Sequence, residues 1–199
     1  MITSTMEYFA QGGPIMAPIL LLSLWMWVLI AERLFFLSQA TKKEISIAQA
    51  IDCLRYRMAP EKSPTKTPGA RLITNFLRRR TGHPIIDQSL LENSLNRERP
   101  RLMRSLNVIL VLAAIAPLLG LLGTVSGMIS TFNVISIFGT GNAKAMAGGI
   151  SEAMITTQSG LLVAIPGFFL GTILKRRAQR LEINLTEMVS ILKRQIRKA

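Results

Sequence analysis

The sequence predicts an all-α membrane protein with three transmembrane helices and long cytoplasmic helical extensions. First, 49% of its 199 residues are hydrophobic, yet 24 Lys and Arg stand against 11 Asp and Glu. Second, these charges are segregated from the apolar residues, a pattern typical of membrane spans with basic flanks. The apolar content excludes a disordered chain. Because Cys53 is the only cysteine and His83 the only histidine, a disulfide scaffold is excluded and a Cys/His metal site is disfavoured.

Three apolar stretches are long enough to cross a bilayer, whose hydrocarbon core of about 30 Å needs roughly 20 helical residues. They cover residues 15–37, 106–138 and 150–174. The second stretch contains no charged residue, which is informative because each buried charge would cost about 2.5–3.5 kcal/mol on insertion. The first stretch lacks preceding basic residues and is too long for a signal-peptide core, so we expect it to remain as a span.

The distribution of basic residues predicts the orientation of these spans. Residues 1–32 contain no Lys or Arg, whereas 33–105 contain fifteen and the tail from Lys175 contains eight. The loop 139–149 contains one. The positive-inside rule therefore places 38–105 and 175–199 in the cytoplasm, with 1–14 and 139–149 outside. Nucleic-acid binding becomes the weaker interpretation of the net charge of +13, because topology already accounts for it.

The cytoplasmic segments are expected to be helical with one Pro- and Lys-rich loop at 60–69. Residues 40–58 are expected to form a helix, whether or not it continues the first span, and 70–80 a short basic helix. A further helix follows from Ile85, and Pro100 should kink or break it. In the tail, apolar residues from Leu174 form one seam, so the third span should run into it as a helix of about 75 Å. Contact with anionic lipid and a specific cytoplasmic partner remain equal interpretations of these basic helices.

The second and third spans carry stripes of small residues at helical spacing. Such stripes allow helix backbones to approach closely in lipid. Two stripes in one chain favour an oligomer, while packing within a single chain is the simpler alternative. The packing glycines are Gly120, Gly123, Gly127, Gly160, Gly167 and Gly171.

Polar side chains form a second pattern in the same spans. Thr124 lies near the middle of the second span, and Glu152, Thr156, Thr157 and Ser159 lie in the outer half of the third. A single Thr is better explained by a bond to its own helix, but a cluster of this size favours a lumen.

Two further features of the spans are their prolines and the absence of charged residues in mid-membrane. Pro117 and Pro166 each remove a backbone hydrogen bond and are expected to bend their helices, as functional kinks or as tolerated bends. No titratable residue lies mid-membrane, although a proton path usually needs one. Either the chain moves no protons, or a partner supplies the carboxylate.

The segments AAIAPLLGLLGTVSGMISTF, from Ala113 to Phe132, and GGISEAMITTQSGLLVAIPG, from Gly148 to Gly167, resemble the MotA/TolQ/ExbB proton-channel family. Ala31-Glu32-Arg33-Leu34 is similar to the E-R motif that closes the family's first span. Three spans with an outside N-terminus resemble the ExbB/TolQ branch. Two departures are Gly148-Gly149, where a proline often precedes the third span, and Pro100 within a usually continuous helix.

The resemblance implies a homopentamer in the bacterial inner membrane, with its N-terminus and the 139–149 loop in the periplasm. Its second and third spans would surround single-span ExbD- or TolR-like partners, each carrying a membrane Asp. Proton flow would then energise a TonB- or TolA-like transducer. In that arrangement Thr124 and Thr157 match the lumen threonines, and Glu152 matches a glutamate of structural or proton-access role. Thr156 and Ser159 are neighbours without family support.

The function expected from this resemblance is a subunit of a proton-motive-force-driven motor, with no enzymatic activity, cofactor or metal. Two alternatives remain. One is a MotA-like motility stator, which would need a fourth span and a large charged cytoplasmic domain. The other is a non-conducting membrane scaffold, in which Thr124→Val and Thr157→Val would leave function intact. The spans contain no catalytic pair, so an intramembrane enzyme is disfavoured.

Overall fold

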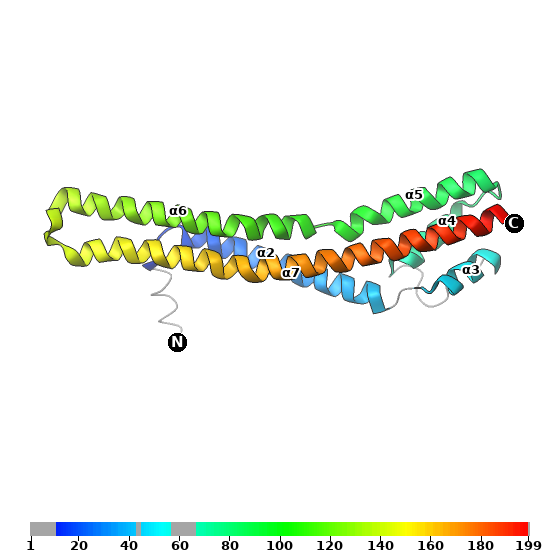
Figure 1. Ribbon diagram of the computed structural model, residues 1–199, viewed down its shortest axis with the longest axis horizontal. Helices are drawn as coiled ribbons and strands as arrows, with labels where there is room; N and C mark the ends of the chain where they lie inside the picture. The colour runs from blue at the N-terminus through cyan, green and yellow to red at the C-terminus, as the bar shows by residue number, and fades with distance from the viewer. Residues whose placement is uncertain (1–10, 43–44, 57–66, 199) are drawn as a thin grey trace. The chain divides into compact units, whose positions relative to one another are not determined.

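The computed structural model describes residues 11–42, 45–56 and 67–198, and every regular element in these ranges is helical. The helices, shown in Figure 1, are α2 (Met16–Lys42), α3 (Ile47–Tyr56), α4 (Pro68–Arg79), α5 (Pro84–Met103), α6 (Leu106–Phe138), a short 3-10 helix (Gly139–Gly141) and α7 (Ala143–Lys198). No strand occurs among the described residues. The all-α fold class is therefore confirmed.

Helices α2, α6 and α7 each contain a stretch that is long and apolar enough to cross a membrane. Large apolar side chains on these helices, such as Leu118, Phe132 and Leu162, remain exposed on the single chain. Exposed apolar surface on this scale is costly in water and is normal against lipid. The chain is a multi-pass membrane protein.

The short helices begin where the sequence supplies capping groups. Ser46 and Gln49 cap α3 reciprocally: the Gln49 backbone N–H donates to Ser46 Oγ at 3.2 Å, and the Ser46 N–H donates to Gln49 Oε1 at 3.3 Å. Thr67 accepts a bond from the Ala70 N–H at 3.4 Å and is followed by Pro68, a residue favoured in the first helical turn.

Two expectations about the chain before α5 need correction. Residues 40–58 do not form one helix, because α2 ends at Lys42 and the Ser46 cap starts a new helix at Ile47. Residues 60–66 of the loop expected at 60–69 lie outside the described residues. Its last residues already belong to α4, since the Thr67 cap and Pro68 start that helix.

Pro100 does not end its helix. Helix α5 continues to Met103, and the break falls at Arg104–Ser105, where Ser105 adopts a left-handed φ of 59°. Leu95 and Leu102 are buried on either side of Pro100, so packing maintains the helix across one missing hydrogen bond.

The connection between the second and third spans is shorter than the expected loop 139–149. Asn142 Oδ1 accepts a bond from the Ala145 N–H at 3.1 Å, so its side chain caps α7, which already begins at Ala143. The expectation that the third span continues into the tail is confirmed, because α7 is one helix of 56 residues.

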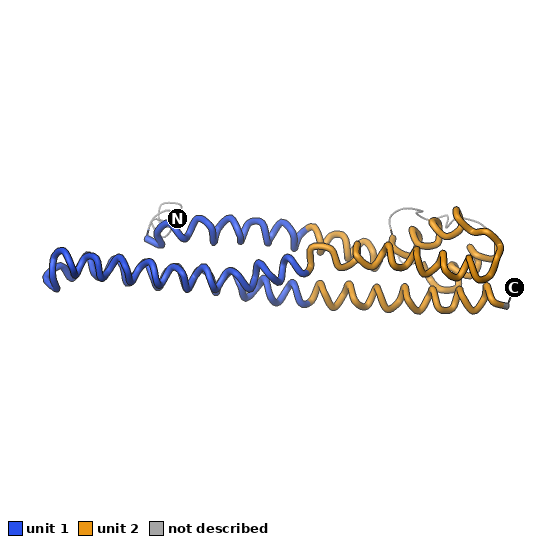
Figure 2. The backbone as a smooth tube through the Cα atoms, turned by 90° about the horizontal axis from the view of Figure 1, so that it is seen from above, with its two compact units in different colours: residues 1–31, 107–172 blue, residues 32–106, 173–199 orange. Residues whose placement is uncertain are grey.

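The chain divides into two compact units, coloured separately in Figure 2. Unit 1 comprises residues 1–31 and 107–172, so it combines the start of α2 with α6 and the first part of α7. Unit 2 comprises residues 32–106 and 173–199. In unit 2 the amphipathic helix α4 buries Leu72, Ile73 and Phe76, and the end of α7 buries Leu185 and other members of the predicted apolar seam.

Candidate lumen-facing site

The small residues of α6 and α7 pack directly against each other in unit 1. A Cβ atom built on Gly160 would lie 2.6 Å from the Ala116 carbonyl oxygen, and one on Gly127 would lie 2.6 Å from the Gly149 oxygen. One on Gly120 would lie 3.1 Å from the Thr157 Cα. Because residue numbers fall along α6 as they rise along α7, the two helices run antiparallel. Only glycine permits backbones to approach this closely.

The other stripe glycines make the same kind of contact. A Cβ on Gly123 would overlap the side chain of Thr156, and one on Gly171 would lie 3.0 Å from Leu110. One on Gly167 would meet both Met26 of α2 and Ala113. The stripes therefore serve packing within one chain, which is the simpler of the two alternatives. They do not by themselves indicate an oligomer.

Thr157 and Thr124 lie half-buried at this helix pair. Thr157 Oγ1 donates a hydrogen bond to the Gly120 carbonyl of α6 at 3.1 Å, and it also lies 3.2 Å from the Ala153 oxygen. Thr124 Oγ1 donates to the Leu121 oxygen of its own helix at 2.6 Å. Each hydroxyl proton is thus directed at a backbone carbonyl, so both oxygens keep lone pairs available as acceptors.

Thr156 and Ser159 have different surroundings. Thr156 is fully buried, and its hydroxyl lies 3.0 Å from the carbonyl oxygens of both Glu152 and Ala153. Ser159 is half-buried and donates to the Ile155 oxygen at 2.8 Å. Thr156 is therefore a packing residue against Gly123, enclosed between the two helices.

Helical geometry places Thr124 and Thr157 on the same flank of the α6–α7 contact. Each threonine follows a contact residue by four positions, Thr124 after Gly120 and Thr157 after Ala153. Four positions correspond to a rotation of about 40° around the helix axis in the direction of the chain. Since the helices are antiparallel and face each other, equal rotations in that sense turn both side chains to one side. The two threonines thus share a flank.

Glu152 and Ser159 lie on the opposite flank, toward the start of α2. Thr157 is about 140° around α7 from Glu152, whereas Ser159 is within about 20° of it. The Glu152 carboxylate contacts Gly13, and a Cβ on Gly12 would lie 3.2 Å from Ile155. Gly13 has a φ of 67°, a conformation that a glycine adopts without strain. The five polar residues grouped by sequence therefore divide into two separate faces.

Pro117 and Pro166 lie inside helices that continue through them. Glu152 is the one carboxylate among the described residues of unit 1, and it lies near the start of α7. Within the described part of this unit, no titratable group is placed beside Thr124 or Thr157.

Arg33 is a buried residue in unit 2 that the sequence indicated only through the E-R motif. Its side chain is 4% exposed. Nη1 donates to the Arg101 carbonyl at 3.2 Å and Nη2 to Ser105 Oγ at 3.5 Å, while the guanidinium lies 5.3 Å from the ring centre of Phe36. Arg33 therefore satisfies a terminal carbonyl of α5 at the helix break. An arginine closing an apolar helix was the available signal.

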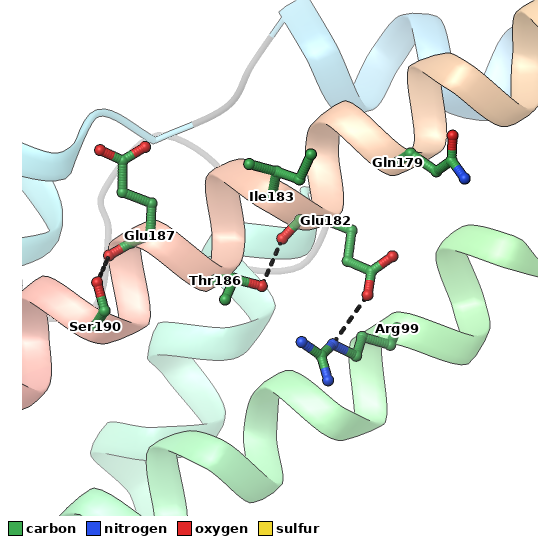
Figure 3. Close-up of a pocket in the computed structure, with 7 residues that line it drawn as sticks. All are labelled: Arg99, Gln179, Glu182, Ile183, Thr186, Glu187 and Ser190. Carbon is green, nitrogen blue, oxygen red and sulfur yellow. Dashed lines mark hydrogen bonds and ion pairs between the residues drawn. The ribbon is translucent and has the colours of Figure 1, made fainter.

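Unit 2 also has an open groove of about 720 Å³ between α5 and α7 (Figure 3). Arg99 is paired there with Glu182 at 3.0 Å, and the hydroxyls of Thr186 and Ser190 donate to carbonyls of their own helix. The charges of Arg99 and Glu182 in this groove compensate each other. Its lining residues are Arg99, Gln179, Glu182, Ile183, Thr186, Glu187 and Ser190.

Three membrane-length helices, two of them paired through glycine, define a multi-pass membrane protein. The chain belongs to the MotA/TolQ/ExbB proton channel family, whose model matches residues 65–187. The ExbB/TolQ-like branch is supported by its relatives.

Among curated proteins, the putative biopolymer transport protein ExbB-like 1 of Synechocystis sp. is 34% identical over 80% of this chain. The match covers 66% of that relative, just under two thirds of its length. ExbB-like 3 of the same organism is 34% identical, with 77% of each chain covered. The biopolymer transport protein exbB1 of Vibrio cholerae is 30% identical over 78% of this chain and 72% of its own length.

Proposed function

We propose that the chain is the ExbB/TolQ-like subunit of a proton-driven motor in a bacterial inner membrane. Several copies, five by the family resemblance, would surround a single-span ExbD- or TolR-like partner and energise a TonB- or TolA-like transducer. The observation that carries the proposal is the shared flank of Thr124 and Thr157, turned away from the start of α2 and free of ionisable groups among the described residues of unit 1.

The chemistry of this flank suits a partner carboxyl group. Both hydroxyl protons are directed at backbone carbonyls, so the oxygens accept hydrogen bonds. A protonated Asp on the partner is a donor and matches these acceptors, whereas an ionised Asp is not. The flank would therefore favour the neutral, proton-loaded state of the partner's carboxyl group. A potential of 100 mV supplies about 2.3 kcal/mol per charge moved.

Orientation follows from the positive-inside rule. The basic segments 38–105 and 175–199 would lie in the cytoplasm, with 1–14 and the connection around residues 139–149 in the periplasm. Anionic lipids would contact the basic segments. Glu152, on the periplasmic side and against Gly13, would take a structural or proton-access role apart from the threonine flank.

The test is proton uptake by vesicles that contain the full chain together with its single-span, Asp-bearing partner. Thr124→Val and Thr157→Val should each abolish the partner-dependent flux, because valine keeps the shape and removes the acceptor. Thr131→Val is the matched control, since Thr131 is buried and bonds the Gly127 oxygen at 3.0 Å. A normal flux in both flank variants would contradict a role of these threonines in conduction. The absence of flux from the unsubstituted chain with its partner would favour the non-conducting scaffold.

Native mass spectrometry tests assembly separately from conduction. Five copies with the Asp-bearing partner bound would support the motor subunit. A monomer or dimer without such a companion would contradict it, and the glycine stripes would then serve internal packing alone.

A further inference from the structure

Ion pairs compensate only part of the positive charge of α4 and α5. Three of the six arginines of α4 and α5 are paired: Arg71 and Arg101 each lie 2.8 Å from Glu98, and Arg99 lies 3.0 Å from Glu182. Arg79 of α4 and Arg97 of α5 make no hydrogen bond or ion pair with any described residue. Their charges are therefore available to an external anion.

Arg79 and Arg97 line one groove of about 390 Å³ between α4 and α5. Asn75 and Arg79 are four residues apart on α4, and Leu90, Asn93 and Arg97 recur at helical spacing on α5, so each helix contributes one face. The complete lining is Asn75, Arg79, Leu90, Asn93, Ser94, Asn96 and Arg97. It carries two positive charges and no carboxylate.

The remaining polar groups in the groove are also suited to an anion. Asn75 and Asn93 are exposed and offer amide N–H donors. Asn96 accepts a bond from Arg99 at 3.4 Å through its oxygen, which leaves its amide nitrogen as a donor. Ser94 already donates to the Leu90 oxygen at 2.8 Å. Two guanidinium forks and three amides surround a space that admits a tetrahedral oxyanion.

The carboxylates nearby are occupied by other partners. Asp87 accepts bonds from the N–H groups of Thr81 and Gly82 and is paired with Arg80 at 3.5 Å. Glu98 is held by two arginines, and Glu92 is paired with Lys193. No described carboxylate of α5 neutralises Arg79 or Arg97. An arginine pair of this kind is typical of phosphate recognition, because each fork presents two parallel donors.

We propose that the α4–α5 groove binds a phosphate group, which bridges Arg79 and Arg97. Two sources share this chemistry: a free phosphate anion and the phosphate of an anionic lipid headgroup. Binding would link α4 to α5, and it does not depend on proton conduction by unit 1. The site therefore goes beyond the motor function proposed above.

The first arm of the test is a calorimetric titration of the full chain with inorganic phosphate, in a sugar detergent free of phospholipid and at constant ionic strength. We expect saturable binding that chloride does not reproduce. Arg79→Gln and Arg97→Gln should each weaken it at least tenfold. Arg78→Gln is the matched control, because Arg78 is an exposed neighbour outside the groove and the variant loses the same charge.

The second arm is native mass spectrometry of the chain after incubation with phosphatidylglycerol. Lipid adducts that persist in Arg78→Gln and disappear in both groove variants would identify a lipid headgroup as the source. Phosphate binding without such adducts would identify the free anion. The proposal is overturned if all three variants behave alike in both arms. It is equally overturned if the groove variants change only the number of copies, since the groove would then be a contact between chains.

Discussion

The hydroxyl of Thr157 donates a hydrogen bond to the Gly120 carbonyl, 3.1 Å away on the neighbouring helix. Because Gly120 has no side chain, the α7 backbone approaches closely enough for this bond to form. The bond fixes both the register of the α6–α7 pair and the direction of the Thr157 lone pairs. One close contact thus links helix packing to the orientation of the flank proposed for the partner's carboxyl group.

Thr157→Val is expected to cost about 0.6 kcal/mol of unfolding free energy, the average measured for interhelical hydrogen bonds in membranes. Thr124→Val should cost less, because the Thr124 hydroxyl bonds only its own helix. Equilibrium unfolding of the chain in mixed micelles measures both values. Thr157→Ser is the control and should retain the bond. Equal losses in the two valine variants would contradict a stabilising role specific to the interhelical bond.

Gly149→Ala should destabilise the chain while Gly148→Ala should not, although the two residues are adjacent on α7. A Cβ on Gly149 would lie 2.8 Å from the Gly127 carbonyl, whereas one on Gly148 would meet nothing within 4 Å. Backbone atoms cannot yield easily, so we expect a cost of about 1–3 kcal/mol from overpacking at Gly149.

Thermal unfolding of both alanine variants in the same detergent measures this difference. Gly148→Ala should match the parent chain or exceed it, because alanine favours helix more than glycine does. Unfolding temperatures that fall equally in the two variants would show that the α6–α7 contact at Gly127 is looser than described.

Hydrophobic periodicity and length predicted the helical class and the bounds of the second apolar stretch, because these depend on local sequence. The same residues could not show which helix each stripe faces. Small residues at steps of three and four allow a close partner, whether in the same chain or another. Contacts such as Gly160 against Ala116 depend on tertiary pairing, which one sequence does not specify.

The sequence grouped the polar residues of the candidate site but did not separate them into two faces. Three of these residues are neighbours in sequence, yet within one helical turn they face different ways. Thr156 faces the interior between the helices, Thr157 faces one flank, and Ser159 faces the opposite flank. The sequence also indicated no role for Arg33 beyond the E-R motif. The hydrogen-bond partner of Arg33, Ser105, lies 72 residues away in the sequence. The left-handed φ of Ser105 is a backbone property that the residue type does not predict.

Alkylation of Cys53 should be slow at neutral pH and should accelerate as the pH rises. Burial raises the pKa of the Cys53 thiol, and the negative charge of Asp52 raises this pKa further. Since the thiolate is the reactive form, a raised pKa lowers the reactive fraction at a given pH. Maleimide labelling rates measured across a pH series give the apparent pKa directly.

Asp52→Asn separates the two causes of that shift. Removing the neighbouring charge should lower the pKa of Cys53 in part and increase its labelling rate, while the contribution of burial remains. The chain denatured in SDS supplies the reference for an unburied thiol. A labelling profile identical in native and denatured chains would contradict the burial of Cys53.

Arg33→Met should destabilise unit 2 by about 1–3 kcal/mol, the cost of leaving a buried acceptor unsatisfied. Methionine keeps much of the apolar volume but loses the bonds to the Arg101 carbonyl and to Ser105. Arg33→Lys keeps the positive charge with a single donor group, so it should retain part of the stability. Hydrogen exchange at the end of α5 measures both variants where the effect is expected. Faster exchange in Arg33→Met than in Arg33→Lys would support the capping role, and unchanged exchange in both would contradict it.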